Sequence, residues 1–256
     1  MLLTHASNVT SAHVIAHSEM RPGPRAYSVY ADWLERRLRG EPIAYLLGFR
    51  EFYGLKFKVS PAVLIPRPET ELLVELALER IAENQPASIL ELGTGSGCIA
   101  VTLGKLRPLT RIVAVDLSPQ ALAIAEANAA QHGVSRIEFR GGNWFEPVAG
   151  ERFDLVVSNP PYIGENDPHM AVGDLRFEPR TALAAGPDGL EMLRNIIAET
   201  PEYLCATGGL LLEHGYDQAA DVRSLLEWRG FVDVATRDDL AGIPRVTLGR
   251  WLTLTS

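Results

Sequence analysis

From Ser88 onward, apolar runs of strand length alternate with stretches of helical length, and this alternation limits the possible folds more than any other feature. Near-continuous apolar strands separated by helices are typical of a parallel sheet with helices on both faces. We expect strands at 88–92, 111–115, 136–140, 153–158, 208–213, 231–236 and 245–254. Helices are expected at about 97–107, 119–131, 189–205 and 217–229. The pattern predicts a seven-stranded, doubly wound α/β sheet.

The last two expected strands are joined by only a short link, residues 237–244. A parallel crossover needs on the order of a dozen residues or more, whereas antiparallel neighbours can be joined by a tight turn. The final strand is therefore expected to be antiparallel. We predict six parallel strands with one antiparallel strand at the edge of the sheet.

The chain before this region has a different organisation. Tyr27–Leu38 has apolar side chains near helical spacing, and Leu47–Ser60 resembles a β-hairpin with aromatic residues around Gly54. Another helix is expected over about 69–84. We therefore divide the chain into an N-terminal helical segment, a β-hairpin linker and an α/β domain, at residues 1–45, 46–66 and 67–256.

Composition narrows the class of function. No apolar run approaches the ~20 residues that a membrane span needs, and no basic segment precedes an apolar stretch at the N-terminus. We therefore expect a cytoplasmic protein without a membrane partner. A formal net charge of −8 argues against a protein that wraps nucleic acid, which requires basic patches. Cys98 and Cys205 both lie in apolar surroundings, so we expect neither a disulfide framework nor a metal site.

A glycine-rich turn joins the first expected strand of the sheet to its helix. Glycine lets the backbone approach a ligand closely, and the start of a helix offers free N–H donors. A dinucleotide loop would have its third glycine at position 98, which is Cys98, and a phosphate loop would need a Lys-Ser/Thr pair, which is absent. Preceded by Glu91, the loop instead resembles the first motif of class I S-adenosylmethionine-dependent methyltransferases. Its candidate cofactor-binding residues are Gly93, Thr94, Gly95, Ser96 and Gly97.

Three residues at the ends of the next strands complete this candidate cofactor site. Asp116 lies 23 positions after Gly93 (116 − 93), close to the ~20 that places a carboxylate on ribose hydroxyls, although it could also cap the next helix. The resemblance implies an acid on the adenine amino group where this chain has Asn143, whose amide oxygen can still accept a hydrogen bond. Trp144 either flanks the adenine or belongs to the core.

The sequence Asn159-Pro160-Pro161-Tyr162 directly follows the apolar run 153–158. Because prolines lack a backbone N–H and have a fixed φ, the chain must form a stiff bend at the carboxyl end of the strand, where α/β folds bind ligands. The Asn159 side-chain oxygen and the Pro160 carbonyl could accept hydrogen bonds from both N–H groups of a target –NH2. The nitrogen lone pair could then point at a sulfonium methyl group. Tyr162 would pack against the planar target.

This motif alone leaves the acceptor open. It is similar to that of enzymes that methylate amino groups of nucleic acids, such as adenine N6, and to that of glutamine side-chain methyltransferases. A non-catalytic cofactor-binding scaffold is a further alternative, but it would be expected to lack Asn159 or the prolines, which are present. The connection from Ile163 to Gly189 has 27 residues and could be a lid or a docking surface.

Further motifs occur along the chain, at Arg39–Leu46, Arg50–Gly54, Leu64–Glu71, Arg176–Leu183, Leu212–Gly215 and Arg245–Arg250. Together they resemble the release-factor glutamine methyltransferases of the HemK/PrmC family, from about residue 27 to the end of the chain. The resemblance implies transfer of a methyl group from S-adenosylmethionine to N5 of the glutamine in the Gly-Gly-Gln loop of peptide chain release factors, with S-adenosylhomocysteine as product and no metal. The sister group that acts on a ribosomal protein looks different near Ile65–Glu71.

The resemblance also implies that the N-terminal helices help to bind the release factor. We expect no direct nucleic-acid partner. About forty residues precede the hairpin, fewer than is usual for the family. We therefore expect weaker docking, or a start at an internal Met. A nucleic-acid methyltransferase would be expected to carry a basic target-recognition region, which a chain of net charge −8 does not display.

Overall fold

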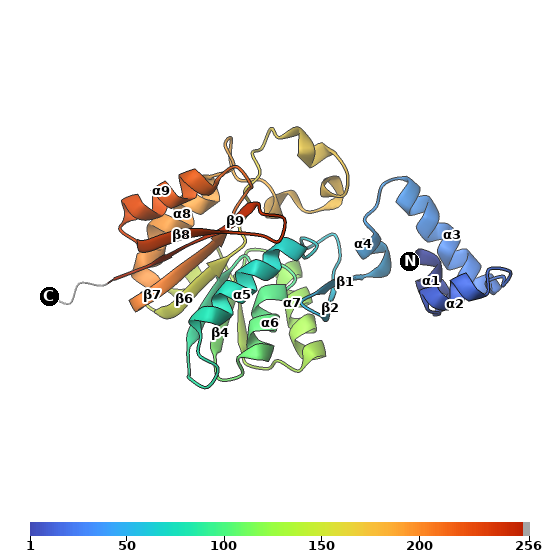
Figure 1. Cartoon of the computed structure of the whole chain (residues 1–256), viewed down its shortest axis with the longest axis horizontal. Helices are drawn as coiled ribbons and strands as arrows, with labels where there is room; N and C mark the ends of the chain where they lie inside the picture. The colour runs from blue at the N-terminus through green and yellow to red at the C-terminus, as the bar shows by residue number, and fades with distance from the viewer. Residues whose placement is uncertain (253–256) are drawn as a thin grey trace.

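A seven-stranded sheet with the strand order β5-β4-β3-β6-β7-β9-β8 forms the larger part of the molecule (Figure 1). The computed structural model describes residues 1–252. Five adjacent strands, from β5 to β7, pair in parallel, which confirms the predicted doubly wound class. The strands are β3 Ser88–Leu92, β4 Arg111–Asp116, β5 Ile137–Gly141, β6 Phe153–Ser158, β7 Leu204–Glu213, β8 Val232–Asp238 and β9 Pro244–Arg250. The expected end of the last strand, at 253–254, lies outside the described residues.

The last strand is antiparallel as predicted, but its predicted position at the sheet edge is wrong. Strand β9 pairs antiparallel with both β7 and β8, so it lies inside the sheet and β8 forms the edge. The exposure of the two strands explains this order. Residues 246–249 of β9 are buried, whereas β8 keeps Asp233 and Arg237 in solvent. Charged side chains are tolerated at an edge strand and protect it from further pairing.

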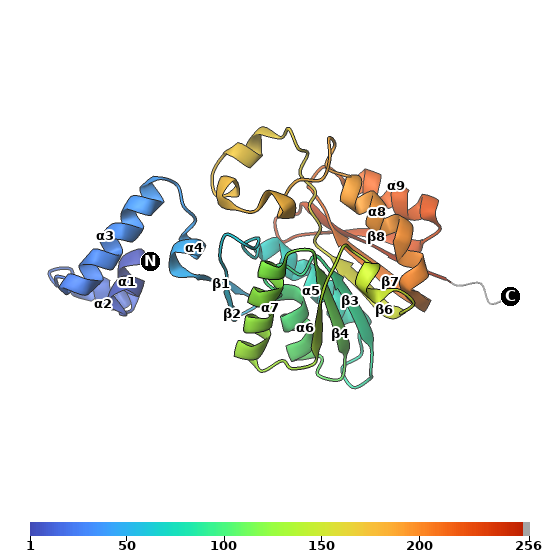
Figure 2. The same cartoon turned by 180° about the vertical axis from the view of Figure 1, so that it is seen from behind.

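Helices cover both faces of the sheet (Figures 1 and 2). On one face Ile89 and Leu155 pack with three helices, and on the other Leu90 and Val156 pack with two. Each fully buried side chain of this size stabilises the fold by roughly 1.5–3 kcal/mol. The helices of the first face are α5 Glu71–Arg80, α6 Cys98–Leu106 and α7 Pro119–His132, and those of the second are α8 Glu191–Glu199 and α9 Ala219–Arg229.

Two expected helices are shorter than predicted. The helix expected over 69–84 ends at Arg80, and the one expected over 189–205 ends at Glu199. In the second case Pro201, which has no backbone N–H to donate, lies in a short 3₁₀ turn, and β7 then begins at Leu204. The 3₁₀ helices are η1 Pro68–Thr70, η2 Glu146–Val148, η3 Pro168–Ala171, η4 Leu175–Phe177, η5 Arg180–Ala182 and η6 Thr200–Tyr203.

The N-terminal helices lie to one side of the sheet, beyond α4 and the hairpin (Figures 1 and 2). Helices α1, α2 and α3 contain no buried residue. The hairpin is fastened to the larger domain by Asn128 of α7, whose side chain accepts from Lys58 N at 2.7 Å and donates to Lys58 O at 3.0 Å. These elements are α1 Leu2–Ser7, α2 Ser11–Ala16, α3 Pro24–Leu38, α4 Ile43–Leu47, β1 Phe49–Phe52 and β2 Leu55–Lys58.

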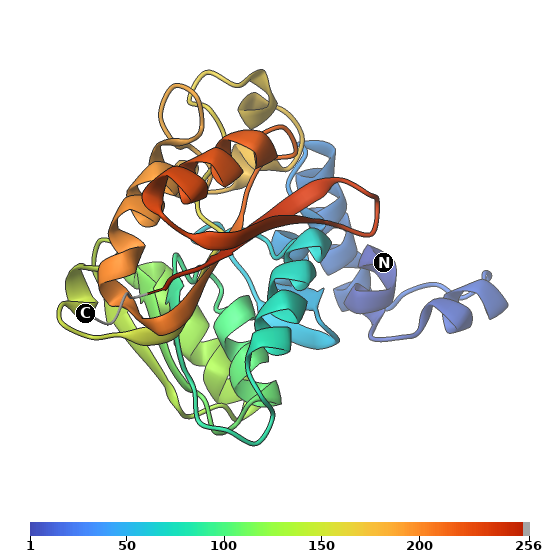
Figure 3. The same ribbon diagram turned by 60° about the vertical axis from the view of Figure 1, so that its left-hand side comes forward.

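The connection between β6 and α8, residues 163–189, forms an irregular arch over one end of the sheet (Figure 3). Arg67 donates to the buried Glu178 of this connection at 2.6 Å. On its outer side, Asp174 pairs with Arg37 of α3 at 3.1 Å. The connection is therefore tied both to the segment before α5 and to the N-terminal helices. Within residues 1–252, no helix is long and apolar enough to cross a membrane.

Candidate functional site

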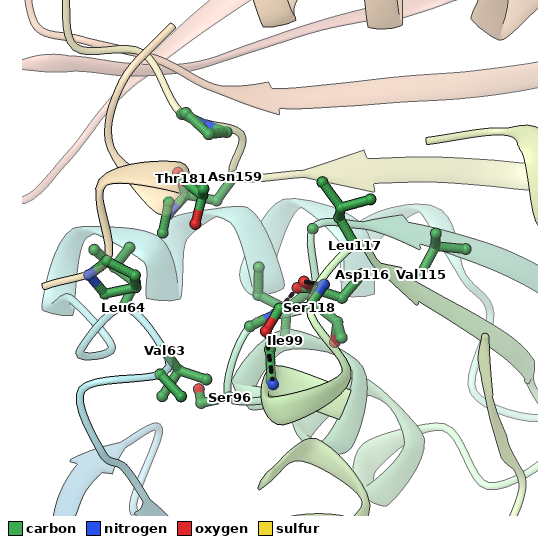
Figure 4. Close-up of a pocket in the computed structure, with 18 of the residues that line it drawn as sticks. Val63, Leu64, Ser96, Ile99, Val115, Asp116, Leu117, Ser118, Asn159 and Thr181 are labelled. Atoms are coloured by element: carbon green, nitrogen blue, oxygen red, sulfur yellow. Dashed lines mark hydrogen bonds between the residues drawn. The ribbon is translucent and has the colours of Figure 1, made fainter. Parts of the chain in front are cut away.

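A cavity of about 620 Å³ lies at the carboxyl ends of β3, β4, β5 and β6 (Figure 4). Strands β3 and β6 are neighbours, yet α6 and α8, the α-helices that follow them in the chain, lie on opposite faces of the sheet. The cavity is therefore at the switch point where open α/β folds bind ligands. Its volume falls in the range of about 300–1,000 Å³ that is usual for small-molecule sites.

The glycine loop is folded tightly between β3 and α6. Gly93 N and Thr94 N donate to Val115 O at 2.9 and 3.0 Å, which holds the loop against β4. Gly97 has a φ of +78°, and a Cβ added there would lie 2.9 Å from the Ala125 Cβ of α7. Glycine is therefore required at this position, both by the left-handed backbone and by the close approach of the two helices.

Asp116 lies in the cavity and also fastens the glycine loop (Figure 4). Its Oδ2 accepts from Gly95 N at 2.8 Å and its Oδ1 from Ser118 N at 2.9 Å. The capping role considered for Asp116 belongs to Ser118, whose hydroxyl accepts from Ala121 N at 3.2 Å. Each carboxylate oxygen keeps a second lone pair that could accept from a ligand hydroxyl.

Trp144 and Asn143 line the same cavity at the end of β5. Trp144 has a φ of +45°, packs against the core and also lines the cavity. A Cβ added at Gly93 would lie 3.7 Å from the Trp144 ring, so this ring covers the start of the glycine loop. Asn143 is exposed, and its backbone N–H donates to Glu146 Oε2 at 3.2 Å.

Only some of the side chains of the bend at 159–162 line the cavity. Asn159 and Pro161 line it, whereas Pro160 is buried and Tyr162 packs against the core. Asn159 Nδ2 donates to Thr70 Oγ1 at 3.2 Å. The Tyr162 hydroxyl donates to Glu213 Oε1 at 3.4 Å, away from the cavity. The structure therefore brings Asn159 to the glycine loop and Asp116, but it does not bring the Tyr162 ring there.

Glu91 is a buried carboxyl group directly beneath the glycine loop. Its Oε2 accepts from the Thr94 hydroxyl at 2.7 Å and from Ala100 N at 3.2 Å, and its Oε1 has no hydrogen-bond partner among the described residues. Burial raises the pKa of Glu91 to about 8, although these two hydrogen bonds oppose the shift. The group is therefore largely protonated at neutral pH, which suits an incompletely paired carboxyl group in the core.

Sequence reasoning assigned no site role to several residues that line the cavity. Val63 and Leu64 precede α5 and face Asp116 and Leu117 across the cavity (Figure 4). The others outside the strand ends come from the segment before α5, from the starts of α6 and α7, from the connection and from α8: Pro66, Arg67 and Thr70; Cys98, Ile99, Gln120 and Ala121; Pro179, Thr181, Ala182 and Ala184; and Met192. Three features of the sequence could have indicated these residues: the motif at 64–71, the motif at 176–183 and the length of the connection. Of the predicted site residues, Gly97, Pro160 and Tyr162 do not line the cavity.

No group of three or more His, Cys, Asp or Glu side chains that could hold a metal ion occurs within residues 1–252. The cavity is lined instead by backbone, amide, hydroxyl and carboxylate groups among apolar side chains. Such a surface suits an organic ligand with hydroxyl and amino groups.

Comparisons with known proteins agree with this geometry. Family models match for the PrmC N-terminal domain at residues 1–48 and the Methyltransferase small domain at 69–186. A release factor glutamine methyltransferase of Xylella fastidiosa (strain Temecula1) is 49% identical over 249 residues, 97% of this chain and 90% of the relative. One of Neisseria gonorrhoeae is 48% identical over 98% of this chain and 92% of the relative. A solved methyltransferase from Pyrococcus furiosus shares the fold, with a TM-score of 0.60 at 17% identity, over 87% of this chain and 100% of that chain.

Proposed function

The chain belongs to the family of release factor glutamine methyltransferases, and we propose that it methylates N5 of the glutamine in the Gly-Gly-Gln motif of peptide chain release factors. The observation that carries this proposal is the position of Asn159. Its side chain enters the cavity at the carboxyl end of β6, beside the strand whose end carries the glycine loop. A hydrogen-bond acceptor at this position can hold an amide next to a methyl donor.

The residues of the cavity fit S-adenosylmethionine as the cofactor. A Cβ added at Gly95 would meet no atom within 4 Å, so the loop leaves open space for a ligand at its surface. In this proposal Gly93, Thr94, Gly95 and Ser96 hold the cofactor through the loop, with Gly97 shaping the turn. Asp116 accepts from the ribose hydroxyls, and Asn143 and Trp144 take the adenine. When bound, the cofactor supplies an electrophilic methyl group on a positively charged sulfur.

Asn159 and Pro160 act on the acceptor amide in this proposal. An amide nitrogen is a weak nucleophile because its lone pair is delocalised into the carbonyl group. The Asn159 Oδ1 and the Pro160 carbonyl would accept hydrogen bonds from its two N–H groups and so favour a pyramidal nitrogen. They would stabilise the positive charge on nitrogen as the methyl group passes from sulfur to nitrogen, before one N–H proton is released to water. The same contacts aim the lone pair along the line of transfer. Pro161 and Tyr162 support this bend, Tyr162 from the core side.

The N-terminal helices are proposed to dock the release factor. Helices α1 to α3 contain no buried residue, and α3 exposes Tyr27 and Leu38 by 63% and 80%. Apolar side chains that a small helical unit leaves in solvent are available to a partner. We thus propose a docking segment, a linker and a catalytic domain at 1–45, 46–66 and 67–256.

The experiment that tests the function incubates the purified protein with methyl-labelled S-adenosylmethionine and a release factor. We expect label on the wild-type release factor and none on a control in which the glutamine of the Gly-Gly-Gln motif is replaced by alanine. Label that persists on this control would contradict the proposed acceptor. Duplex DNA and RNA in parallel reactions test the alternative of a nucleic-acid amino-methyltransferase, and label on either of these substrates alone would favour it.

A further inference from the structure

Asn128 of α7 is a polar residue in the core, with an exposure of 0%. It does not line the cavity, and no step of the proposed reaction uses it. Burying an asparagine destabilises a protein unless its amide groups have hydrogen-bond partners. The partners of Asn128 therefore indicate its role.

The side chain of Asn128 makes three hydrogen bonds to the backbone of two different segments. Its Oδ1 accepts from Lys58 N at 2.7 Å, and its Nδ2 donates to Lys58 O at 3.0 Å and to Ser96 O at 2.8 Å. Lys58 is the last residue of β2, whereas Ser96 belongs to the glycine loop. Because all three partners are backbone groups, only one orientation of the amide satisfies them. One buried side chain thus joins the hairpin to the loop.

The bond to Ser96 O holds the end of the glycine loop against α7. A Cβ added at Gly97 would lie 2.9 Å from the Ala125 Cβ, so the loop is already in close contact with this helix. Asn128 follows Ala125 by three residues and lies on the same face of α7. The peptide between Ser96 and Gly97 is held on both sides, because Gly97 N donates to Thr94 O at 2.8 Å. This peptide cannot turn over without losing both hydrogen bonds.

The bonds to Lys58 hold the wall of the cavity that faces the loop and Asp116. Residues 62–64, which begin four positions after Lys58, line the cavity, and Val63 lies across it from Asp116 (Figure 4). Val63 also packs in one buried cluster with Ile124 of α7. Helix α7 therefore supports both walls, and Asn128 is hydrogen bonded to the chain on each side.

We propose that Asn128 is a positioning residue of the cofactor site, which braces the glycine loop and the segment 58–64 at the separation that S-adenosylmethionine needs. This inference rests on the proposed function and deepens it. A brace that is formed before the ligand arrives lowers the cost of ordering the site on binding.

A role confined to fastening the hairpin does not account for Asn128. Two other side chains of α7 already contact the hairpin backbone. Gln131 Nε2 donates to Lys56 O at 2.7 Å, and His132 Nε2 lies 2.9 Å from the same oxygen. Neither of them reaches the glycine loop, whereas Asn128 uses one of its two N–H donors for Ser96 O. The loop is therefore the contact that distinguishes Asn128 from its neighbours.

Cofactor affinity, measured apart from the rate of methyl transfer, tests the inference. Asn128→Leu keeps nearly the same shape but removes all three hydrogen bonds. We expect the calorimetric Kd for S-adenosylmethionine to rise by about tenfold or more, the effect of losing one buried hydrogen bond. At saturating cofactor, the single-turnover rate on a release factor should stay within about threefold of wild type, because the proposed acceptor groups are unchanged. A wild-type Kd in folded Asn128→Leu would overturn the inference and leave the proposed function intact.

Two control variants separate the brace from a general loss of stability. Gln131→Ala removes a hairpin contact from the same helix but leaves the loop untouched. Thr200→Val removes a buried hydrogen bond outside the cavity, in which the Thr200 hydroxyl donates to Ile196 O at 2.6 Å. We expect both controls to keep the cofactor Kd within about threefold of wild type. A loss of cofactor affinity in either control equal to that of Asn128→Leu would overturn the inference.

Hydrogen exchange of the wild-type protein tests the brace without a substitution, and it decides the question if Asn128→Leu does not fold. S-adenosylmethionine should slow exchange of the Lys58 amide by about tenfold more than that of the Ser88 amide, because a ligand that orders the loop also stabilises the other end of the brace. Ser88 N likewise donates to a side-chain oxygen, Asp154 Oδ2 at 2.8 Å, outside the cavity. Equal slowing at the two amides would overturn the inference alone. A wild-type protein that binds no S-adenosylmethionine would overturn the proposed function, and this inference with it.

Discussion

At the scale of single residues, the site depends on groups that present lone pairs to the cavity. Asn159 offers an amide oxygen and Asp116 a carboxylate, and both are held by hydrogen bonds to neighbouring residues. Acceptors held in advance stabilise charge without reorganising during the reaction. Each can therefore be tested by a change that removes or neutralises the acceptor.

Replacing Asn159 by alanine should impair the chemical step rather than cofactor binding. The loss of one preorganised hydrogen-bonding group in such a site costs about 10²–10³ in kcat. We expect a fall of this size in Asn159→Ala, measured by single-turnover methylation, with an unchanged dissociation constant for S-adenosylmethionine from calorimetry. Asn166→Ala, an exposed asparagine of the connection, serves as control. Equal losses in rate and in cofactor affinity would instead make Asn159 a cofactor-binding residue.

Asp116→Asn should impair cofactor binding rather than the chemical step. The amide nitrogen would face a backbone N–H donor, either that of Gly95 or that of Ser118, and the negative charge offered to the proposed ribose hydroxyls would be lost. We expect cofactor affinity to fall by about tenfold or more, because charge-assisted hydrogen bonds are roughly twice as strong as neutral ones. Asp154→Asn is the control, since Asp154 also accepts from a backbone N–H, that of Ser88 at 2.8 Å, outside the cavity. Unchanged calorimetric affinity in Asp116→Asn would remove Asp116 from the site.

At the scale of elements, one close constraint is the contact between the start of α6 and the middle of α7. Gly97→Ala places a methyl group 2.9 Å from the Ala125 Cβ and also strains a φ of +78°. Gly133→Ala has a similar φ of +69° but meets no atom within 4 Å. We expect Gly97→Ala to lower the free energy of unfolding by about 1–3 kcal/mol more than Gly133→Ala does, the usual cost of overpacking. Equal losses in urea unfolding would mean that α6 and α7 move apart freely.

At the scale of the whole molecule, the contribution of Glu91 to stability should fall as the pH rises towards the alkaline side of neutrality. Burial raises the pKa of Glu91 from its usual 4.5 to about 8. Between these two pKa values, the folded protein binds more protons than the unfolded chain. The contribution of Glu91 to the free energy of unfolding is therefore complete below about pH 4.5 and is lost as the pH rises to about pH 8. Each pKa unit corresponds to about 1.4 kcal/mol.

Glu91→Gln should flatten this dependence. The glutamine amide oxygen can accept from the Thr94 hydroxyl and Ala100 N as the carboxyl group does, but it does not ionise. Urea unfolding at a series of pH values, for wild type and Glu91→Gln, measures the difference. We expect the variant to gain stability relative to wild type as the pH rises through the window. Parallel curves would show that Glu91 titrates at its ordinary pKa in the folded protein.

Local sequence patterns predicted the strands and the position of the candidate site. The apolar run 153–158 followed by Asn159 and two prolines can only be a buried strand that ends in a stiff bend, because periodicity and proline geometry are local properties. The glycine loop was also recognisable from the sequence, because glycine is the residue that adopts a positive φ without steric cost. Both features depend on neighbours in the chain, and both lie where they were expected.

The residues across the cavity and behind it became known only from the packing of the folded chain. The placement of β9 inside the sheet, the turn of Tyr162 towards Glu213, and the approach of Thr70 to Asn159 all join residues distant in sequence. Local sequence patterns could not predict these contacts. Two strands of similar length could each occupy the sheet edge, and a side chain meets its hydrogen-bond partner only after the elements have packed. The motif thus predicted a role for Asn159, and the fold around it shows that Thr70 holds its amide.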